Sequence, residues 1–285
     1  MKKILIPTDF SVPAENAARY GLELAKGLKA DVVLCNAIKV PADAPMAAQV
    51  AWPLMDYADL KEEVTGDLDE MVKMLTDSCS NQETYCPELT YETDAGTVCE
   101  VVSRLVKDKK IDLVVMGIAG AGGLTQFLLG SNSKEMIEKA EIPVLFIPFE
   151  ANFKKLRKIA LATDFGEQDI FSLQFIEEFA QAFDAEITIV HITSKEVAPG
   201  GQLQAKIDAF LDRTALNVNY PHIKFEYVWN IDIDNGLEWL AEQEGLDMIA
   251  LCHHHHGLLD RIFRGSHTQK LSRHTKIPLL VFSQK

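Results

Sequence analysis

The chain carries the same series of segments twice, and this internal repeat limits the possible folds more than any other feature of the sequence. Four segments of the first half match four segments of the second half in the same order, at an offset of 155 for the first two and 135 for the last two. The matched segments are 3–10 with 158–165, 30–35 with 185–190, 112–117 with 247–252, and 142–146 with 277–281. This repetition predicts two homologous domains, residues 1–150 and residues 151–285.

The two copies differ in length because the offset falls by 20 between the second and third matched segments. The first domain therefore carries about 20 extra residues, which we expect within residues 40–60, where three prolines cluster. A short link, roughly residues 149–155, joins the two domains.

Each half alternates strand-like and helix-like patterns. Short, continuously apolar runs rich in branched residues are typical of strands buried on both faces of a parallel sheet. Between them lie amphipathic stretches with helical spacing, the first of which is expected to end in a turn that contains Gly27. In the first half the strands are expected at 4–6, 32–34, 113–116 and 144–147, and the helices at 14–28, 60–75 and 98–106. This order predicts an α/β fold with a doubly wound open sheet in each half.

Composition excludes several classes of function. The net charge is −14, which argues against non-specific binding to nucleic acid and against an anionic membrane surface. No apolar run reaches the length of a membrane span, and the apolar run after Met1 is too short for a signal peptide. The five cysteines form no CxxC motif. We therefore expect a cytoplasmic protein.

Three glycines lie at a fixed spacing in the first half, between an apolar run and a helix-like segment. The pattern is Gly117-x2-Gly120-x9-Gly130, followed directly by Ser131. Glycines allow the backbone to approach a ligand closely or to take positive φ, and Ser131 and the residues after it would open a helix whose free N–H groups attract anions. The pattern is neither a Walker loop nor GxGxxG. It predicts a loop that wraps phosphates, with a ligand-free βα turn as the alternative.

The second half has lost this pattern. Cys252 and His255 replace the first two glycines, while Gly265 and Ser266 remain. Side chains there would enter the phosphate space, and a Cβ at a residue with positive φ would be strained, so we expect one phosphate-binding site per chain. Residues 253–256 are four consecutive histidines, for which a polar replacement loop, a pH- or anion-sensitive loop and a metal site are the alternatives.

The glycine pattern, the later IPVLF and the opening ILIPTD together resemble the universal stress protein family in its tandem two-domain form, over essentially the whole chain. The resemblance implies two tandem doubly wound, mainly parallel five-stranded sheets of the Rossmann-like, adenine-nucleotide alpha hydrolase-like kind. It implies an ATP or other adenine nucleotide ligand. The contacts implied are Pro7, Thr8, Asp9, Ala37, Ile38, Met116, Gly117, Gly120, Gly130, Ser131, Asn132 and Ser133. For Asp9, a helix N-cap is an alternative role.

No nucleophile–base pair is evident, and Cys35 and Cys99 fall within apolar patterns typical of inert core residues. The leading hypothesis is a non-enzymatic, ATP-binding stress-response module with no catalytic residues, its alternatives being an interaction scaffold that binds no nucleotide and a weak ATPase. In so acidic a chain, Mg²⁺ is expected to accompany the nucleotide. The last strands of the two halves, 144–147 and 279–282, are expected to pair as an intramolecular pseudo-dimer, and a homodimer is a further possibility.

Overall fold

In the computed structural model of the chain, the described residues are 1–39, 57–79, 85–118, 130–193, 201–229, 231, 233–243, 245–253 and 277–283. Several predicted features lie outside these residues. They are most of the extra segment (40–56), Gly120, His254 to His256, Gly265 and Ser266.

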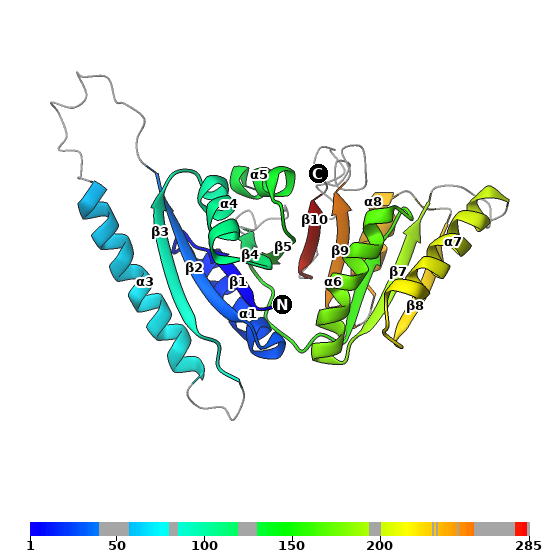
Figure 1. Cartoon of the computed structure of the whole chain (residues 1–285), viewed down its shortest axis with the longest axis horizontal. Helices are drawn as coiled ribbons and strands as arrows, with labels where there is room; N and C mark the ends of the chain where they lie inside the picture. Colours follow the sequence, from blue (N-terminus) through cyan, green and yellow to red (C-terminus); the bar gives the residue numbers. More distant parts are fainter. Residues whose placement is uncertain are drawn as a thin grey trace, which may run out of the picture.

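The first half alternates strands and helices along the chain (Figure 1). Its elements are β1 (Lys3–Pro7), α1 (Val12–Leu28), β2 (Asp31–Ile38), α3 (Tyr57–Cys79), β3 (Leu89–Ala95), α4 (Val98–Lys109), β4 (Leu113–Ile118), α5 (Ser131–Lys139) and β5 (Val144–Pro148). Among the described residues, the second half repeats this order as far as β9, with β6 (Lys158–Ala162), α6 (Glu167–Phe183), β7 (Glu186–Ile192), α7 (Gln202–Asn217), β8 (Ile223–Val228), α8 (Ile233–Ala241) and β9 (Met248–His253). Its last described strand is β10 (Leu279–Ser283).

The strands of both halves form one ten-stranded sheet in the order β3-β2-β1-β4-β5-β10-β9-β6-β7-β8. All neighbouring strands within a half are parallel, as the apolar runs predicted, and the sheet is doubly wound in each half. The chain reverses the direction of strand addition between β1 and β4, and between β6 and β9. In open α/β sheets, ligands bind at the carboxyl ends of the strands on either side of such a switch point.

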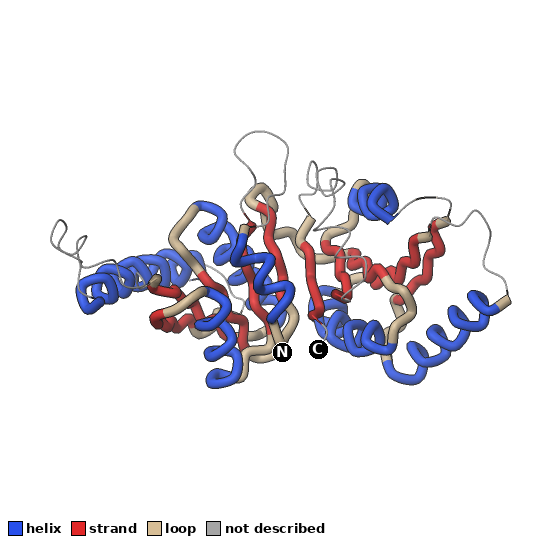
Figure 2. Tube along the Cα trace, turned by 90° about the horizontal axis from the view of Figure 1, so that it is seen from above, coloured by secondary structure: helices blue, strands red, loops and turns tan. Residues whose placement is uncertain are grey.

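Helices cover both faces of the sheet, as the tube in Figure 2 shows from above. Alternate residues of a strand point to opposite faces, so Ile4 and Ile6 pack with α1 and α3, while Leu5 packs with α4 and α5. The second half follows the same plan, with α6 and α7 on the first face and α8 on the second. Burial on both faces explains why the central strands read as continuous apolar runs.

Helix α1 extends beyond the segment predicted for it. Pro13 lies in its first turn, where the missing N–H costs nothing, and the helix ends at Lys29 in the left-handed conformation. The last helical residue is Leu28, in a turn that contains Gly27, as predicted, although the left-handed residue is Lys29 and Gly27 is itself helical. A Cβ there would lie 2.2 Å from the ring of Phe183, so this glycine lets α1 of the first half pack directly against α6 of the second.

The two halves meet at the centre of the sheet, where β5 and β10 pair in antiparallel orientation with Leu145 opposite Leu280. The link between them lies against α1, since the Asn16 side chain donates to the carbonyl oxygens of Pro148 and Ala151. Phe153 packs edge-on against Tyr20. The amino group of Met1 forms an ion pair with Glu178 of the second half. The halves are therefore joined by strand pairing, by helix packing and by the chain itself.

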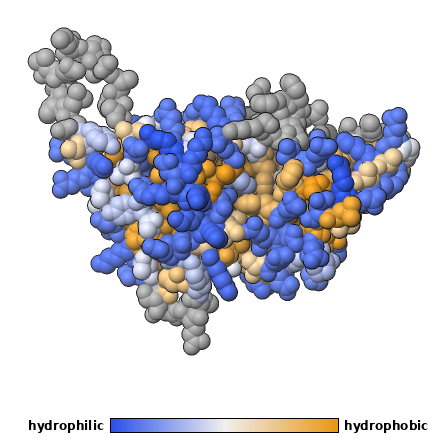
Figure 3. Space-filling view, in the orientation of Figure 1, coloured by the Kyte–Doolittle hydropathy of each residue, from blue (hydrophilic) through white to orange (hydrophobic). Residues whose placement is uncertain are grey.

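Polar side chains cover much of the face in Figure 3, with apolar residues gathered near the middle of the molecule and on the second half. Among the described helices, none is long and apolar enough to cross a membrane.

Candidate functional site

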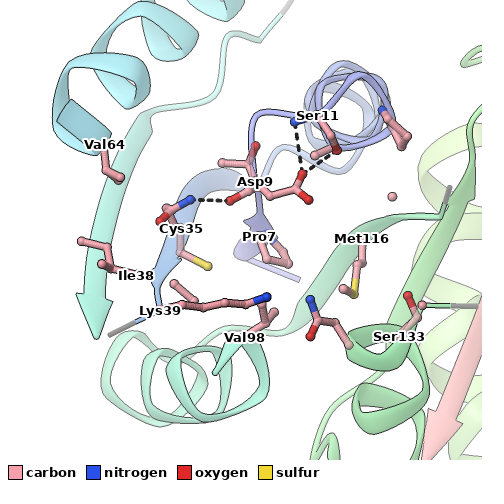
Figure 4. A pocket seen from close by; sticks show the side chains of 18 of the residues that line it. Pro7, Asp9, Ser11, Cys35, Ile38, Lys39, Val64, Val98, Met116 and Ser133 are labelled. Atoms are coloured by element: carbon pink, nitrogen blue, oxygen red, sulfur yellow. Dashed lines mark hydrogen bonds between the residues drawn. The ribbon is translucent and has the colours of Figure 1, made fainter. Parts of the chain in front are cut away.

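A cavity of about 530 Å³ opens at the carboxyl ends of β1, β2 and β4, beside the switch point of the first half. Its walls come from the ends of these strands, the first turns of α1 and α5, the start of α3 and the first residue of α4 (Figure 4). The lining residues are Pro7, Thr8, Asp9, Ser11, Pro13, Ala14, Cys35, Asn36, Ala37, Ile38, Lys39, Leu60, Val64, Val98, Met116, Gly117, Gly130, Ser131, Asn132 and Ser133.

Eleven of the twelve residues that the resemblance indicated line this one cavity. They come from four separate parts of the sequence, at residues 7–9, 37–38, 116–117 and 130–133. The twelfth, Gly120, lies outside the described residues. The fold therefore brings the indicated residues together, while their contacts with a ligand remain a prediction.

Thr8 and Asp9 form the turn that leads from β1 into α1. Phe10 has a φ of 60°, a left-handed conformation that is unusual outside glycine. The Phe10 N–H donates to the buried Thr8 hydroxyl at 3.0 Å, and the Ser11 N–H donates to Asp9 Oδ1 at 3.1 Å. The N-cap residue is Ser11, so Asp9 is not the cap itself.

The same turn occurs in the second half, where Phe165 has a φ of 67°. Its N–H donates to the Thr163 hydroxyl at 2.8 Å, and the Gly166 N–H donates to Asp164 Oδ1 at 3.1 Å. The Thr-Asp sequence thus has a structural role in both halves. Its presence in the second half therefore does not by itself indicate a ligand.

The glycines act differently from what the sequence suggested. Neither Gly117 nor Gly130 has positive φ. A Cβ on Gly117 would lie 2.4 Å from the carbonyl oxygen of Pro13, so this glycine permits close packing of β4 against the start of α1. Among the described residues, a Cβ on Gly130 would meet no atom within 4 Å, so Gly130 leaves space open at the cavity wall.

The first turn of α5 supplies hydrogen-bond donors to one end of the cavity. Gly130 is the N-cap of this helix and offers no side chain to satisfy its free N–H groups. Ser131, Asn132 and the buried Ser133 all line the cavity. A helix terminus with unsatisfied N–H groups and hydroxyls attracts anions.

The opposite end of the cavity is apolar. Ile38 at the end of β2, Val64 on α3 and Val98 on α4 lie on this wall (Figure 4). Leu60, one turn before Val64 on α3, also lines the cavity. The side-chain amide of Asn36, which is also buried, donates to the Thr8 carbonyl at 2.9 Å and holds β2 against β1. The sequence reasoning missed these residues, apart from Ile38. Asn36 gave a signal, since it is a polar residue inside an otherwise apolar strand.

Two charged residues, Asp9 and Lys39, belong to the described lining of the cavity. Lys39 was also missed, although it is the first charged residue after the apolar run of β2. Cys35 lies at the base of the cavity, and burial raises the pKa of its thiol to about 12, so it stays protonated. Burial also raises the pKa of Cys99. Both cysteines lie in the core, as predicted.

The second half places different side chains at the equivalent positions. Asp169 replaces Ala14, Ser172 replaces Ala17 and Cys252 replaces Gly117. Asp169 is fully buried, and its Oδ2 accepts from the Thr163 hydroxyl and from the Gly166 N–H at 3.0 Å. The Cys252 sulfur lies 3.1 Å from the Ser172 hydroxyl. Burial, and next the nearby Asp169 carboxylate, raise the pKa of Cys252.

This geometry corrects part of the sequence argument. Cys252 does not have positive φ, and its sulfur contacts α6. The strain expected for a side chain at this position is therefore absent, and the residue serves to pack β9 against α6. His255 lies outside the described residues, so the argument from its side chain stays a prediction.

An aromatic stack stands beside the turn of the second half. His191, which replaces the cavity-lining Asn36, lies between the rings of Phe165 and Tyr227, at centroid distances of 4.4 and 5.6 Å. Its Nδ1 lies 2.7 Å from the Thr163 carbonyl oxygen. Lys206 of α7 donates to the Asp164 carbonyl at 2.8 Å. Bulky side chains and α7 thus occupy the neighbourhood that borders the cavity in the first half.

Fold and site together define a class: α/β proteins with doubly wound parallel sheets and a ligand-sized cavity at the switch point. The family profile described as "Universal stress protein family" matches residues 1–148 and again residues 155–283. The chain therefore belongs to the universal stress protein family, with one copy of its fold in each half.

Individual relatives agree with this assignment. The chain is 32% identical over 146 residues to the universal stress protein MJ0531 of Methanocaldococcus jannaschii. This alignment covers 51% of this chain and 81% of that protein. A second protein of the same organism, MJ0577, is 29% identical over 154 residues, covering 51% of this chain and 94% of that protein.

Two solved structures resemble the whole fold. A universal stress protein from Archaeoglobus fulgidus superimposes with a TM-score of 0.70 at 14% identity, covering 99% of this chain and 98% of that one. A protein of unknown function from Pseudomonas aeruginosa PAO1 gives a TM-score of 0.58 at 12% identity, covering 99% and 92%. At such identity these likenesses concern the fold alone.

Proposed function

We propose that the first half binds one adenine nucleotide, ATP with Mg²⁺, and that the protein is a cytoplasmic stress-response module that senses this nucleotide rather than an enzyme. One observation carries the proposal. A single cavity at the switch point has an apolar wall at one end and an uncapped helix N-terminus at the other. A nucleotide has the same division between a flat, weakly polar base and an anionic tail.

The two ends of the cavity fix the direction of the ligand. The base fits between Ile38, Val64 and Val98, where apolar side chains can cover its faces. The ribose then lies near Asp9, and the phosphates near the first turn of α5. The proposed contacts are those named from the sequence, with Gly117 acting through the packing of α1.

The lining also fits a magnesium–nucleotide complex. Mg²⁺ keeps several waters and takes oxygen ligands from phosphates and one or two carboxylates. Asp9 is the one carboxylate among the described lining residues, and its Oδ1 already accepts from Ser11. Phosphate oxygens and water would therefore supply most of the magnesium ligands, with Asp9 beside them.

We further propose a division of labour between residues 1–150 and residues 151–285. The second half has Asp169, Cys252 and the His191 stack where the first half has its cavity. Its role is to pair with the first half through β10, as an intramolecular pseudo-dimer in place of two single-domain copies.

Isothermal titration of the full chain with ATP tests the proposal. We expect one site per chain and a lower affinity when EDTA removes Mg²⁺. The substitution Gly130→Leu should abolish binding without unfolding the protein, because its side chain would enter open space at the cavity wall with an ordinary φ.

Gly66→Leu is the matched control. Gly66 also has no atom within 4 Å of an added Cβ, but it is no part of the described cavity lining, so this variant should bind ATP normally. Two equal sites per chain, or equal affinity in Gly130→Leu and the unmodified protein, would contradict the proposed site. Equal binding with and without EDTA would remove Mg²⁺ from the proposal.

A further inference from the structure

Lys39 extends across the proposed nucleotide cavity from the end of β2. Figure 4 shows its side chain running from the side of Ile38 toward the side where Met116 and Ser133 lie. It is the one cationic residue among the described lining residues. Among the described residues, Lys39 has no ion-pair partner. Arg19 and Lys109, in contrast, are each paired with a glutamate.

The position of Lys39 relative to α5 follows from the strand order. β2 and β4 are separated by β1, so their carboxyl ends lie about 10 Å apart across the cavity. The four-carbon stem of a lysine covers much of such a gap. An ammonium group on the β2 side and the N–H groups of α5 on the other side therefore face the same space.

Lys39 supplies positive charge at a site where the protein otherwise has little to offer an anionic ligand. The whole chain carries a net charge of −14, and the other charged residue of the described lining is Asp9. A helix N-terminus contributes about half a positive charge, which offsets only a small part of the negative charge of a nucleoside triphosphate. Without Lys39, Asp9 would be the one charged side chain in the part of the lining that the structure describes.

We propose that Lys39 binds the phosphates of the ligand from the side opposite α5, and that this contact makes the site select phosphorylated nucleosides over free nucleosides. The inference rests on the proposed nucleotide site and adds to it the residue that sets the preference for charge. The ammonium group of a lysine is a point charge on a flexible stem, so it can reach the phosphates from the end of a strand without a fixed binding geometry.

Titration of the full chain with two probes, ATP and adenosine, tests this role. Lys39→Met keeps most of the apolar stem and removes the charge. We expect it to lower ATP affinity about tenfold, the range of one charge-assisted hydrogen bond, and to leave adenosine affinity unchanged. Lys39→Arg should retain most of the ATP affinity, and raising the salt concentration should weaken ATP binding less in Lys39→Met than in the unmodified protein.

Lys134→Met is the matched control, because Lys134 is an exposed lysine of α5 that does not line the cavity. It should leave both affinities unchanged. Equal losses in the two variants would mean that only the general field of the protein matters, and an equal loss of adenosine and ATP in Lys39→Met would mean a nucleoside contact. Either result overturns the inference while the site stands. If the unmodified protein binds neither ATP nor adenosine, the proposed nucleotide site itself is overturned.

Discussion

At the scale of single residues, the two halves keep one turn and change what surrounds it. The hydroxyls of Thr8 and Thr163 accept from the N–H groups of two equivalent phenylalanines in the left-handed conformation. The neighbouring Asn36 of the first half, however, is replaced by His191 in the second. Both side chains lie against the threonine carbonyl, through Asn36 Nδ2 and His191 Nδ1. The histidine adds a titratable group, and burial lowers its pKa below the usual value near 6.5.

This shift predicts a pH dependence of stability. Because the folded state lowers the pKa of His191, the unfolded state binds more protons as the pH falls through about 6.5, and stability is lost in that direction. His191→Asn copies the first half and removes the titration while it can keep the bond to the Thr163 carbonyl. Urea unfolding at a series of pH values should show that the unmodified protein loses more stability between about pH 7.5 and 5.5 than the variant does. The other histidines are common to both proteins, so parallel pH curves would refute this role.

The sequence identified lining residues that lie at the ends of strands and helices, and it missed those that lie within a helix. Pro7 to Asp9 and Gly130 to Ser133 stand next to recognisable strand and helix boundaries, so a local pattern was enough to select them. Leu60 and Val64 had no such signal. They are ordinary apolar positions of an amphipathic helix, and they face the cavity only because α3 packs across β2 and β3.

At the scale of elements, the two described glycines of the predicted loop, Gly117 and Gly130, both line the cavity, but Gly117 does so for a reason that the sequence did not suggest. The expectation was backbone freedom or close approach to a ligand, whereas Gly117 provides room for the Pro13 carbonyl and Gly27 provides room for Phe183. Such needs arise between elements far apart in sequence, so no local pattern distinguishes them. Likewise, the buried central strands were predicted, but the edge strand β3, with its alternating polar residues, was not located.

Gly117→Ala tests this structural role. The new Cβ would lie 2.4 Å from a backbone oxygen that cannot rotate away, so β4 and α1 would have to move apart. We expect the free energy of unfolding to fall by about 1–3 kcal/mol, as in other overpacked sites. Gly130→Ala is the control, since its Cβ meets no neighbour among the described residues, and it should be within about 0.5 kcal/mol of the unmodified protein. Urea unfolding measures both, and equal stability of the two variants would show that the strand and helix adjust freely.

At the scale of the whole molecule, the duplication pairs the two inner sheet edges, those of β5 and β10. A five-stranded sheet ending at β5 would expose unpaired N–H and C=O groups on a strand whose residues are all buried in the full chain. Pairing with β10 satisfies both inner edges at once, and the packing of α1 on α6 covers the adjoining helices. Because one chain carries both halves, this association does not depend on protein concentration.

Separating the halves should restore that dependence. Residues 1–150 expressed alone retain β5 but lack β10, so two copies can pair through the same antiparallel edge, with Leu145 near the centre of the new seam. We expect analytical ultracentrifugation to show a concentration-dependent dimer, because the surface that Phe183 covers in the full chain would also need a partner. The full chain, whose inner edges are already paired, should not associate through this strand at any concentration. If the first half is monomeric at the highest concentration tested, β5 is stable as a free edge. The association of the two halves in the full chain would then have to come from the helices and the link.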